Sequence, residues 1–104
     1  MYVSLTRVST GAEPAGTATI VAEEMTAWLR DIDGFEGFLM LTQPGTTLGL
    51  TFWSSRDVAE LHRAARMEFL ERMTSVAGVD VEETLDFGVA FSELSARAAS
   101  ARPR

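Results

Sequence analysis

The stretch between residues 34 and 53 decides the fold of this chain. It reads GFEGFLMLT over residues 34–42, QPGTT over 43–47 and LGLTFW over 48–53. The two outer runs are short, apolar and rich in aromatic and β-favouring residues, which is typical of strands. The Pro44-Gly45 pair between them is a strong turn signal. The stretch therefore predicts an antiparallel hairpin of two largely buried strands.

Helical patterns flank this hairpin on both sides. Before it, a helix is expected to begin at Glu13 and Pro14, apolar residues recur at helical spacing from Val21 to Ile32, and Gly34 is the expected C-terminal cap. After it, a second amphipathic helix is expected to run from Ser54, its N-cap, to Gly78, with Asp57 completing a capping box. Each helix is long enough to cover part of a sheet.

Alternating patterns at the two ends supply the remaining strands. Residues 1–8 and 81–91 both alternate between apolar and polar side chains, as half-buried strands do. Together with the hairpin and helices, the order becomes β-α-β-β-α-β, which is the ferredoxin-like split motif. We therefore predict an α+β fold with an antiparallel sheet, built from a domain over residues 1–91 and a tail over residues 92–104.

The second strand of the predicted sheet is apolar on both faces. Phe35, Leu39 and Leu41 are expected on one face, and Phe38 and Met40 on the other. Two helices can cover only one face of a four-stranded sheet, and a large exposed apolar face marks an interaction surface. We therefore expect a homodimer formed through the sheet face.

Composition excludes several classes of protein. With 104 residues, 46% hydrophobic and 23% charged, the chain has the makeup of one ordinary globular domain. It has no apolar run long enough for a membrane span, and no basic and apolar leader at its start, so a cytoplasmic location is expected. Cysteine is absent, which excludes disulfides and thiolate chemistry. The net charge of −6 and the lack of lysine argue against nucleic acid as a partner.

Two motifs resemble a known family. The sequence GFEGF at residues 34–38 and the sequence WSSRD at residues 53–57 are similar to motifs of the antibiotic biosynthesis monooxygenase domain, one of the dimeric α+β barrels. The likeness covers residues 1–91 and includes the order of the elements. It implies two ferredoxin-like protomers packed sheet to sheet, each with its own pocket between sheet and helices. Quinol-oxidising monooxygenases, haem-degrading enzymes and isomerases all occur on this fold.

The chain departs from the functional residues of these relatives. The haem-degrading members imply an Asn on the first strand and a Trp and a His on the second helix, where this sequence has Arg7, His62 and Arg72. The quinol monooxygenases imply an Asn in the pocket, and this chain contains no Asn. Neither mechanism transfers residue by residue, and no haem or other cofactor is expected.

Two residues are candidates for catalysis. His62 is the only histidine, and imidazole exchanges protons readily near neutral pH, so His62 would serve as a base. Its alternative role is a histidine at the edge of a helix stripe. Arg7 is a charge on an otherwise apolar strand face, and it would stabilise an oxyanion or pair with Asp86. A lone histidine without carboxylates at ligand spacing predicts no metal site.

A pocket is expected between the sheet and the second helix. Trp53 would stack on an aromatic ligand there or fix the junction between strand and helix, while Arg66 and Arg72 would rim the pocket or carry solvated charges. The apolar residues expected nearby are Phe38, Met40, Leu50, Phe52 and Phe69.

These residues support two hypotheses about function. The first is a cofactor-independent monooxygenase that acts on an aromatic or polyketide-like quinol, with His62 as base and Arg7 at the oxyanion. The second is a small-ligand-binding or structural dimer of the same fold without catalysis. The family resemblance favours the first, and the absence of Asn favours the second.

Overall fold

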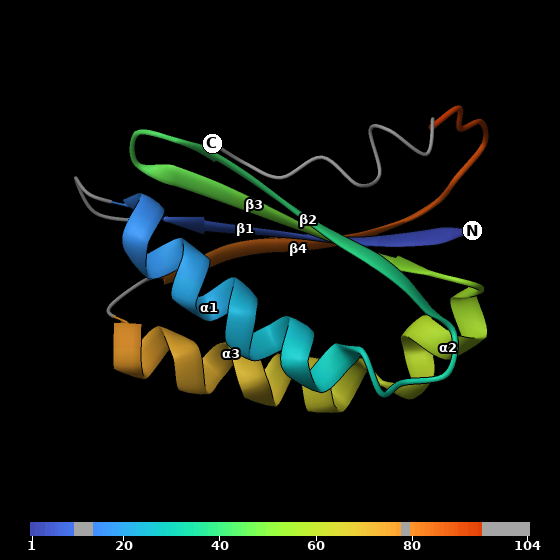
Figure 1. Ribbon diagram of the computed structural model, residues 1–104, viewed down its shortest axis with the longest axis horizontal. Helices are drawn as coiled ribbons and strands as arrows, with labels where there is room; N and C mark the ends of the chain where they lie inside the picture. The colour runs from blue at the N-terminus through green and yellow to red at the C-terminus, as the bar shows by residue number, and fades with distance from the viewer. Residues whose placement is uncertain (10–13, 78–79, 95–104) are drawn as a thin grey trace.

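The computed structural model describes residues 1–9, 14–77 and 80–94. Its elements, in chain order, are β1 (Tyr2–Ser9), α1 (Pro14–Leu29), β2 (Phe35–Gln43), β3 (Thr46–Trp53), α2 (Arg56–Leu61), α3 (Arg63–Ala77) and β4 (Asp80–Gly88), as Figure 1 shows. The strands form one antiparallel sheet in the order β2-β3-β1-β4. The predicted α+β, ferredoxin-like fold is therefore confirmed.

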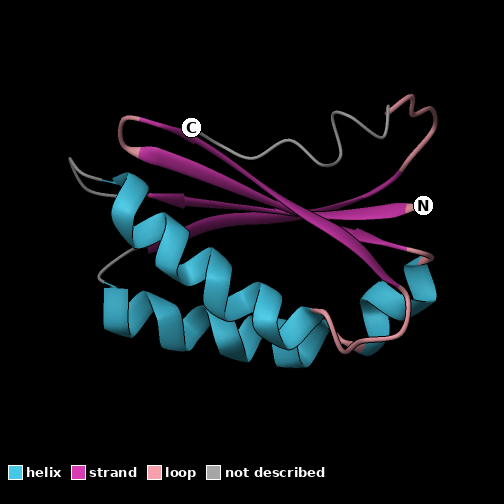
Figure 2. Cartoon of the chain, viewed as in Figure 1, coloured by secondary structure: helices cyan, strands magenta, loops and turns pink. Residues whose placement is uncertain are grey.

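The molecule has two layers. The long helices α1 and α3 lie against the same face of the sheet, and α2 lies at the end where β3 finishes (Figure 2). We call this the helix-facing side and the opposite one the outer face. No described helix covers the outer face. The described residues therefore place a core on one side of the sheet and leave the other side without a covering helix.

The hairpin that dominates the sequence forms as predicted. Strands β2 and β3 pair antiparallel, with Leu39 opposite Leu50 and Gln43 opposite Thr46. Pro44 and Gly45 make the turn, and Gly45 has a φ of +83°, a conformation that glycine adopts without steric cost. Local sequence is therefore sufficient to specify this turn.

A register shift in β2 corrects one predicted face. The pairing with β3 is irregular between Phe35 and Gly37, so that Phe35 lies opposite Trp53 and Gly37 opposite Phe52. The extra residue keeps Phe35 on the helix-facing side, where its ring meets Trp53 edge-on at 6.2 Å between centroids. The prediction that Phe35 shares a face with Leu39 was wrong because a β-bulge reverses the alternation locally.

The second helix is two helices. The chain turns at His62, with φ −103° and ψ 7°, which separates the short α2 from α3. The N-cap of α2 is Ser55, whose hydroxyl accepts a hydrogen bond from the backbone N–H of Val58 at 3.3 Å. The prediction of one continuous helix was therefore wrong, because the helix breaks at His62. The predicted N-cap, Ser54, was wrong by one residue.

Gly34 ties the hairpin to the helical layer. It lies beyond the last residue of α1 and is not that helix's cap, although its φ of +94° does require glycine. Its carbonyl accepts a 2.8 Å hydrogen bond from the N–H of Ser54, which joins the starts of the two sequence motifs. A Cβ on Gly34 would lie 2.8 Å from Ser54 Oγ and 2.9 Å from both methyl groups of Val58.

The core lies between the sheet and the helices. Trp53 and Leu29 are completely buried, and Met25, Ala59 and Phe69 join them in one cluster. The indole Nε1 of Trp53 donates to Ser4 Oγ at 3.3 Å, which satisfies the one polar group of the ring. The first helix therefore docks on the sheet through Met25 and Leu29.

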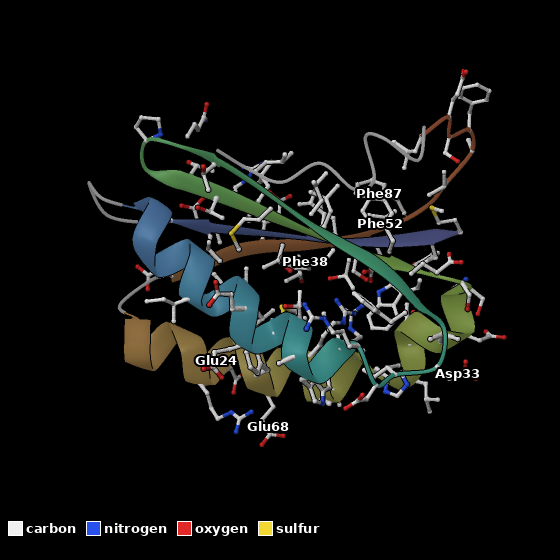
Figure 3. The ribbon with its side chains drawn as sticks, viewed as in Figure 1. Glu24, Asp33, Phe38, Phe52, Glu68 and Phe87 are labelled. Carbon is white, nitrogen blue, oxygen red and sulfur yellow. The ribbon has the colours of Figure 1, made fainter. Side chains whose placement is uncertain are left out.

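The outer face is apolar, as predicted. Figure 3 shows Phe52 and Phe87 on the side away from the helices, whereas Phe38 points toward them. Leu39 and Phe87 remain 46% and 49% exposed. The other apolar residues whose strand register puts them on this face are Val3, Leu5, Leu41, Leu48, Leu50 and Leu85.

Two further predictions concern the ends of the chain and membranes. Residues 95–104 of the predicted tail lie outside the described part of the structure, so the boundary at residue 91 stays a prediction. Among the described residues, no helix is both long enough and apolar enough to cross a membrane.

Candidate functional site

The helix-facing side of the sheet carries polar side chains along most of the length of β3 and along the neighbouring β1. Thr47, Thr51 and Trp53 alternate along β3, and Ser4 and Thr6 follow the same face of the neighbouring β1. Ser4 is 1% exposed, and Thr47 and Thr51 are 2% and 3% exposed. Hydroxyl groups are unusual in a small core unless each has a hydrogen-bond partner, so this face is a candidate for a binding site.

A small cavity lies between this face and the helices. Its volume is about 50 Å³, and its apolar walls come from β2, α1 and α3, namely Phe38, Met40, Met25 and Leu70. Gly49 and the threonines Thr6, Thr47 and Thr51 supply its floor. The cavity therefore combines apolar walls with hydroxyl groups, as small-molecule sites do.

Thr47 is the cavity residue whose hydroxyl group lacks a hydrogen-bond partner among the described residues. Its Oγ1 is also buried, and a buried hydroxyl without a partner costs about 1–3 kcal/mol. A bound molecule with a polar atom would remove that cost, which makes Thr47 a ligand-binding candidate.

The size of the cavity limits what it holds as it stands. A dry apolar cavity of about 150 Å³ accommodates benzene, and this one is much smaller. An aromatic ring would have to displace side chains, and the flexible thioethers of Met25 and Met40 are suited to such movement. As it stands, the cavity has room for a molecule the size of dioxygen or water.

A polar cluster continues the site toward the end of β3. Asp86 of β4 and Ser4 of β1 are register partners on the helix-facing side, next to Trp53. Arg63 donates from Nη1 to Asp86 Oδ2 at 2.6 Å. This ion pair fixes α3 to the edge strand, and it lies beside the third charged residue of the cluster, Arg66.

Arg66 is the most deeply buried charge among the described residues. Its side chain lies over the Trp53 ring, with Cζ 5.6 Å from the ring centroid, and it is 3% exposed. Its Nε has no hydrogen-bond partner among the described residues. Burial lowers the pKa of Arg66 from its ordinary value, and the nearby carboxylate of Asp86 opposes that shift. The alternative prediction of a solvated helix charge is wrong for Arg66.

His62 lies beside the same tryptophan. Its ring stacks on the Trp53 ring at 6.1 Å between centroids and 11° between planes. The turn between α2 and α3 presents the ring in this direction. His62 is not among the residues that line the small cavity, so its role as a base stays a prediction.

Arg7 lies on the opposite side of the sheet. Its register partners Leu48 and Glu83 belong to the outer face, and its Nη1 is 3.5 Å from Glu83 Oε2. Asp86, the partner suggested by the sequence, pairs with Arg63 instead. The prediction that Arg7 and His62 share one pocket was wrong, because strand alternation sends the two side chains to different faces.

The apolar lining was predicted in part. Phe38 and Met40 line the cavity, but Leu50 and Phe52 lie on the outer face and cannot join them. Phe69 is in the core, where its ring is parallel to that of Trp28 at 6.3 Å. A ligand-binding role for the outer-face residues stays a prediction, but it belongs to a different surface.

Sequence reasoning missed the threonines. The sequence pattern predicts no functional role for Thr6, Thr47 or Thr51. The signal available was the unbroken series of small or polar residues at alternate positions 47, 49 and 51, ending in Trp53. Such a series opposite an apolar helix stripe indicates a sheet face that helices cover but whose small side chains leave space beneath them.

Metal ligands are not gathered in the described part of the chain. No group of three or more His, Asp or Glu side chains there could hold a metal ion. The chemistry available at the site is therefore that of hydroxyl groups, one imidazole, two guanidinium groups and the Asp86 carboxylate.

The fold is that of antibiotic biosynthesis monooxygenases. No family model matches the chain, and no curated protein matches it. Among solved structures, a putative antibiotic biosynthesis monooxygenase from Deinococcus radiodurans has a TM-score of 0.68 at 21% identity, over 91% of this chain and 100% of that one.

Two further structures of this fold carry more specific descriptions. SnoaB, a cofactor-independent oxygenase from Streptomyces nogalater, has a TM-score of 0.66 at 17% identity, over 88% of this chain and 94% of its own. A monooxygenase of Streptomyces coelicolor in complex with the ligand nanaomycin D has a TM-score of 0.70 at 13% identity, over 91% and 92%. At these identities the likeness is one of fold.

Proposed function

We propose that this protein is a cofactor-independent monooxygenase that oxidises an aromatic or polyketide-like quinol. The observation that carries the proposal is the cavity between sheet and helices, with its apolar walls and the unpartnered hydroxyl of Thr47. The fold is shared with a cofactor-independent oxygenase and with a monooxygenase that binds nanaomycin D. The likeness favours an organic ligand that displaces the flexible side chains of Met25 and Met40, and the hydroxyl of Thr47 favours one that carries a polar atom.

The reaction needs only the substrate, dioxygen and a base. A base removes a proton from an activated carbon of the substrate, and the resulting carbanion passes one electron to O₂. Recombination gives a carbon-bound hydroperoxide, and loss of water leaves a new carbonyl group. In sum, a CH₂ group and O₂ become C=O and H₂O, so that the substrate supplies all the electrons. An apolar cavity favours this course because it holds the carbanion away from water.

His62 is the proposed base. Its ring stacks on Trp53, and the polar cluster around Trp53 continues the face that floors the cavity. Because the ring is not in the cavity wall, the proposal requires that bound substrate extends toward the Trp53 end or that the proton moves through a water. A base within reach of the reacting proton accelerates such a step by roughly 10²–10⁴-fold.

Oxidation of dithranol without added metal or flavin tests the proposal. We expect oxygen uptake and quinone formation with the wild-type protein, and loss of both with His62→Ala. Gly49→Val should also abolish turnover, because Gly49 lines the cavity and a Val side chain would occupy it. Gly88→Val is the matched control, since nothing lies within 4 Å of a Cβ at Gly88. No turnover over a panel of anthrones and naphthoquinols would refute the enzyme.

A binding protein of the same fold is the second candidate. Two observations favour it: the chain contains no Asn, and His62 is not among the residues that line the cavity. It predicts that aromatic ligands bind, that Gly49→Val blocks this binding, and that no oxygen is consumed. Ligand titrations run beside the oxidation assay therefore separate the two candidates.

We also propose that the protein acts as a homodimer in the cytoplasm. The exposed apolar groups of the outer face, among them Leu39, Leu85 and Phe87, support assembly through the sheet. No nucleic acid or membrane is proposed as a partner. In such a dimer the helix-facing site of each protomer stays open to ligand.

A further inference from the structure

Arg66 occupies a position that is costly for a charged group. It is 3% exposed, and its Nε has no hydrogen-bond partner in the described part of the chain. A guanidinium group carries its N–H donors in a fixed fork, and burial is tolerated when an anion meets that fork. Contact with the Trp53 ring compensates only in part, since a cation over an aromatic face satisfies no hydrogen bond.

The carboxylates near Arg66 are already engaged. Asp86 Oδ2 accepts a hydrogen bond from Arg63 Nη1 at 2.6 Å, and Glu60 Oε1 lies 3.8 Å from Arg56 Nε. Both carboxylates act on the charge of Arg66, but neither forms an ion pair with it in the described part of the chain. The Arg66 guanidinium therefore has no carboxylate in direct contact among the described residues.

The Arg66 guanidinium, which has no ion-pair partner among the described residues, lies at one end of the helix-facing site. Arg66 precedes Leu70 by one turn of α3, and Leu70 lines the cavity. Trp53, beneath the guanidinium, follows Thr51 by two residues on the same face of β3, and Thr51 lines the cavity too. A ligand that enlarges the cavity toward Trp53 would bring an atom to the Arg66 fork.

We propose that Arg66 binds an anionic oxygen of an aromatic ligand, either a carboxylate or an ionised phenol. This proposal rests on the proposed function, which places the aromatic ring of the ligand in the helix-facing cavity. It adds that the ligand is negatively charged. An ionised phenol at Arg66 would be the form of a quinol that is readiest to transfer an electron to O₂. The competing explanation is structural, with Arg66 serving only to hold Trp53 in place.

Three aromatic probes test the charge preference. 2-Naphthoate carries a fixed carboxylate, and 2-naphthamide is its neutral counterpart of nearly the same shape. We expect calorimetry to show at least tenfold tighter binding of 2-naphthoate by the wild-type protein. The third probe, 4-nitrophenol, reports the phenol source: at a pH where both forms are present, binding should increase the absorbance of the phenolate. Equal affinity for the acid and the amide would overturn the proposal, whichever variants fold.

Variants separate binding from structure. Arg66→Met keeps much of the apolar stem and removes the charge, so the preference for 2-naphthoate should fall by at least tenfold. Arg72→Met is the matched control, because Arg72 lies on the same helix over the Phe69 ring but is exposed. We expect Arg66→Met to have a Tm equal to or above that of the wild type. A lower Tm with an unchanged preference would establish the structural role instead.

The outcome is independent of turnover. Quinol oxidation without a preference for the anionic probe would leave the monooxygenase standing and refute the role of Arg66. A clear preference for the anionic probe without oxidation of any quinol would support the role of Arg66 and refute the monooxygenase. If Arg66→Met does not fold, Arg66→Lys keeps the charge and removes the planar fork, and it should weaken 2-naphthoate binding while leaving 2-naphthamide unchanged.

Discussion

Substitution of Gly34 by alanine tests how the two sequence motifs hold the fold. Gly34 has a φ of +94°, and the side chain added there would meet Ser54 Oγ at 2.8 Å and both Val58 methyl groups at 2.9 Å. Ser54 can turn away, but the Val58 methyl groups are fixed close to the helix backbone. Gly34→Ala should therefore force the start of α2 away from the hairpin.

The expected loss has two parts. A non-glycine residue in the left-handed region costs roughly 1–2 kcal/mol. Overpacking against Val58 adds about 1–3 kcal/mol, as extra methyl groups in a packed core do. The total of about 2–5 kcal/mol is a large share of the roughly 5–15 kcal/mol by which a domain is stable. A loss at the lower end corresponds to a fall in Tm of roughly 10 °C for a chain of this length.

Two other glycines separate the backbone from the packing contribution. Gly45 has a φ of +83° with nothing within 4 Å of its Cβ position, so Gly45→Ala should cost only the conformational part. Gly88 has neither a positive φ nor a close neighbour, so Gly88→Ala should be nearly neutral. Urea unfolding followed by tryptophan fluorescence gives the three free energies. If Gly34→Ala costs no more than Gly45→Ala, the packing argument at the junction is incorrect.

The remaining predictions concern assembly, the core and haem. Light scattering should give twice the 11.3 kDa chain mass for the wild type, the monomer mass for Leu39→Glu, and the dimer for Ile20→Glu, which places the same charge on an exposed apolar site of α1. Ser4→Ala leaves the buried Nε1 of Trp53 without its acceptor and should lower the free energy of unfolding by about 1–3 kcal/mol in urea. Titration with hemin should give no sharp Soret shift, and a shift abolished by His62→Ala would contradict the inference from the family's missing ligands.

The sequence by itself was sufficient for the features that depend on near neighbours. The Pro44-Gly45 turn, the helix stripes and the order of elements all follow from local spacing, because backbone preference and periodicity act within a few residues. The sequence also predicted the apolar character of the outer face, since the second strand carries large apolar groups on both of its faces.

Tertiary structure alone decided where the charges and hydroxyl groups lie. Strand register sends Arg7 to Glu83 and leaves Asp86 for Arg63, and a bulge returns Phe35 to the core. Strand register depends on pairing between residues that are distant in sequence, and a shift of one position moves every side chain of the strand to the other face of the sheet. Helix periodicity likewise could not predict that Arg66 is buried or that Thr47 has no partner, because burial depends on how closely the two layers approach.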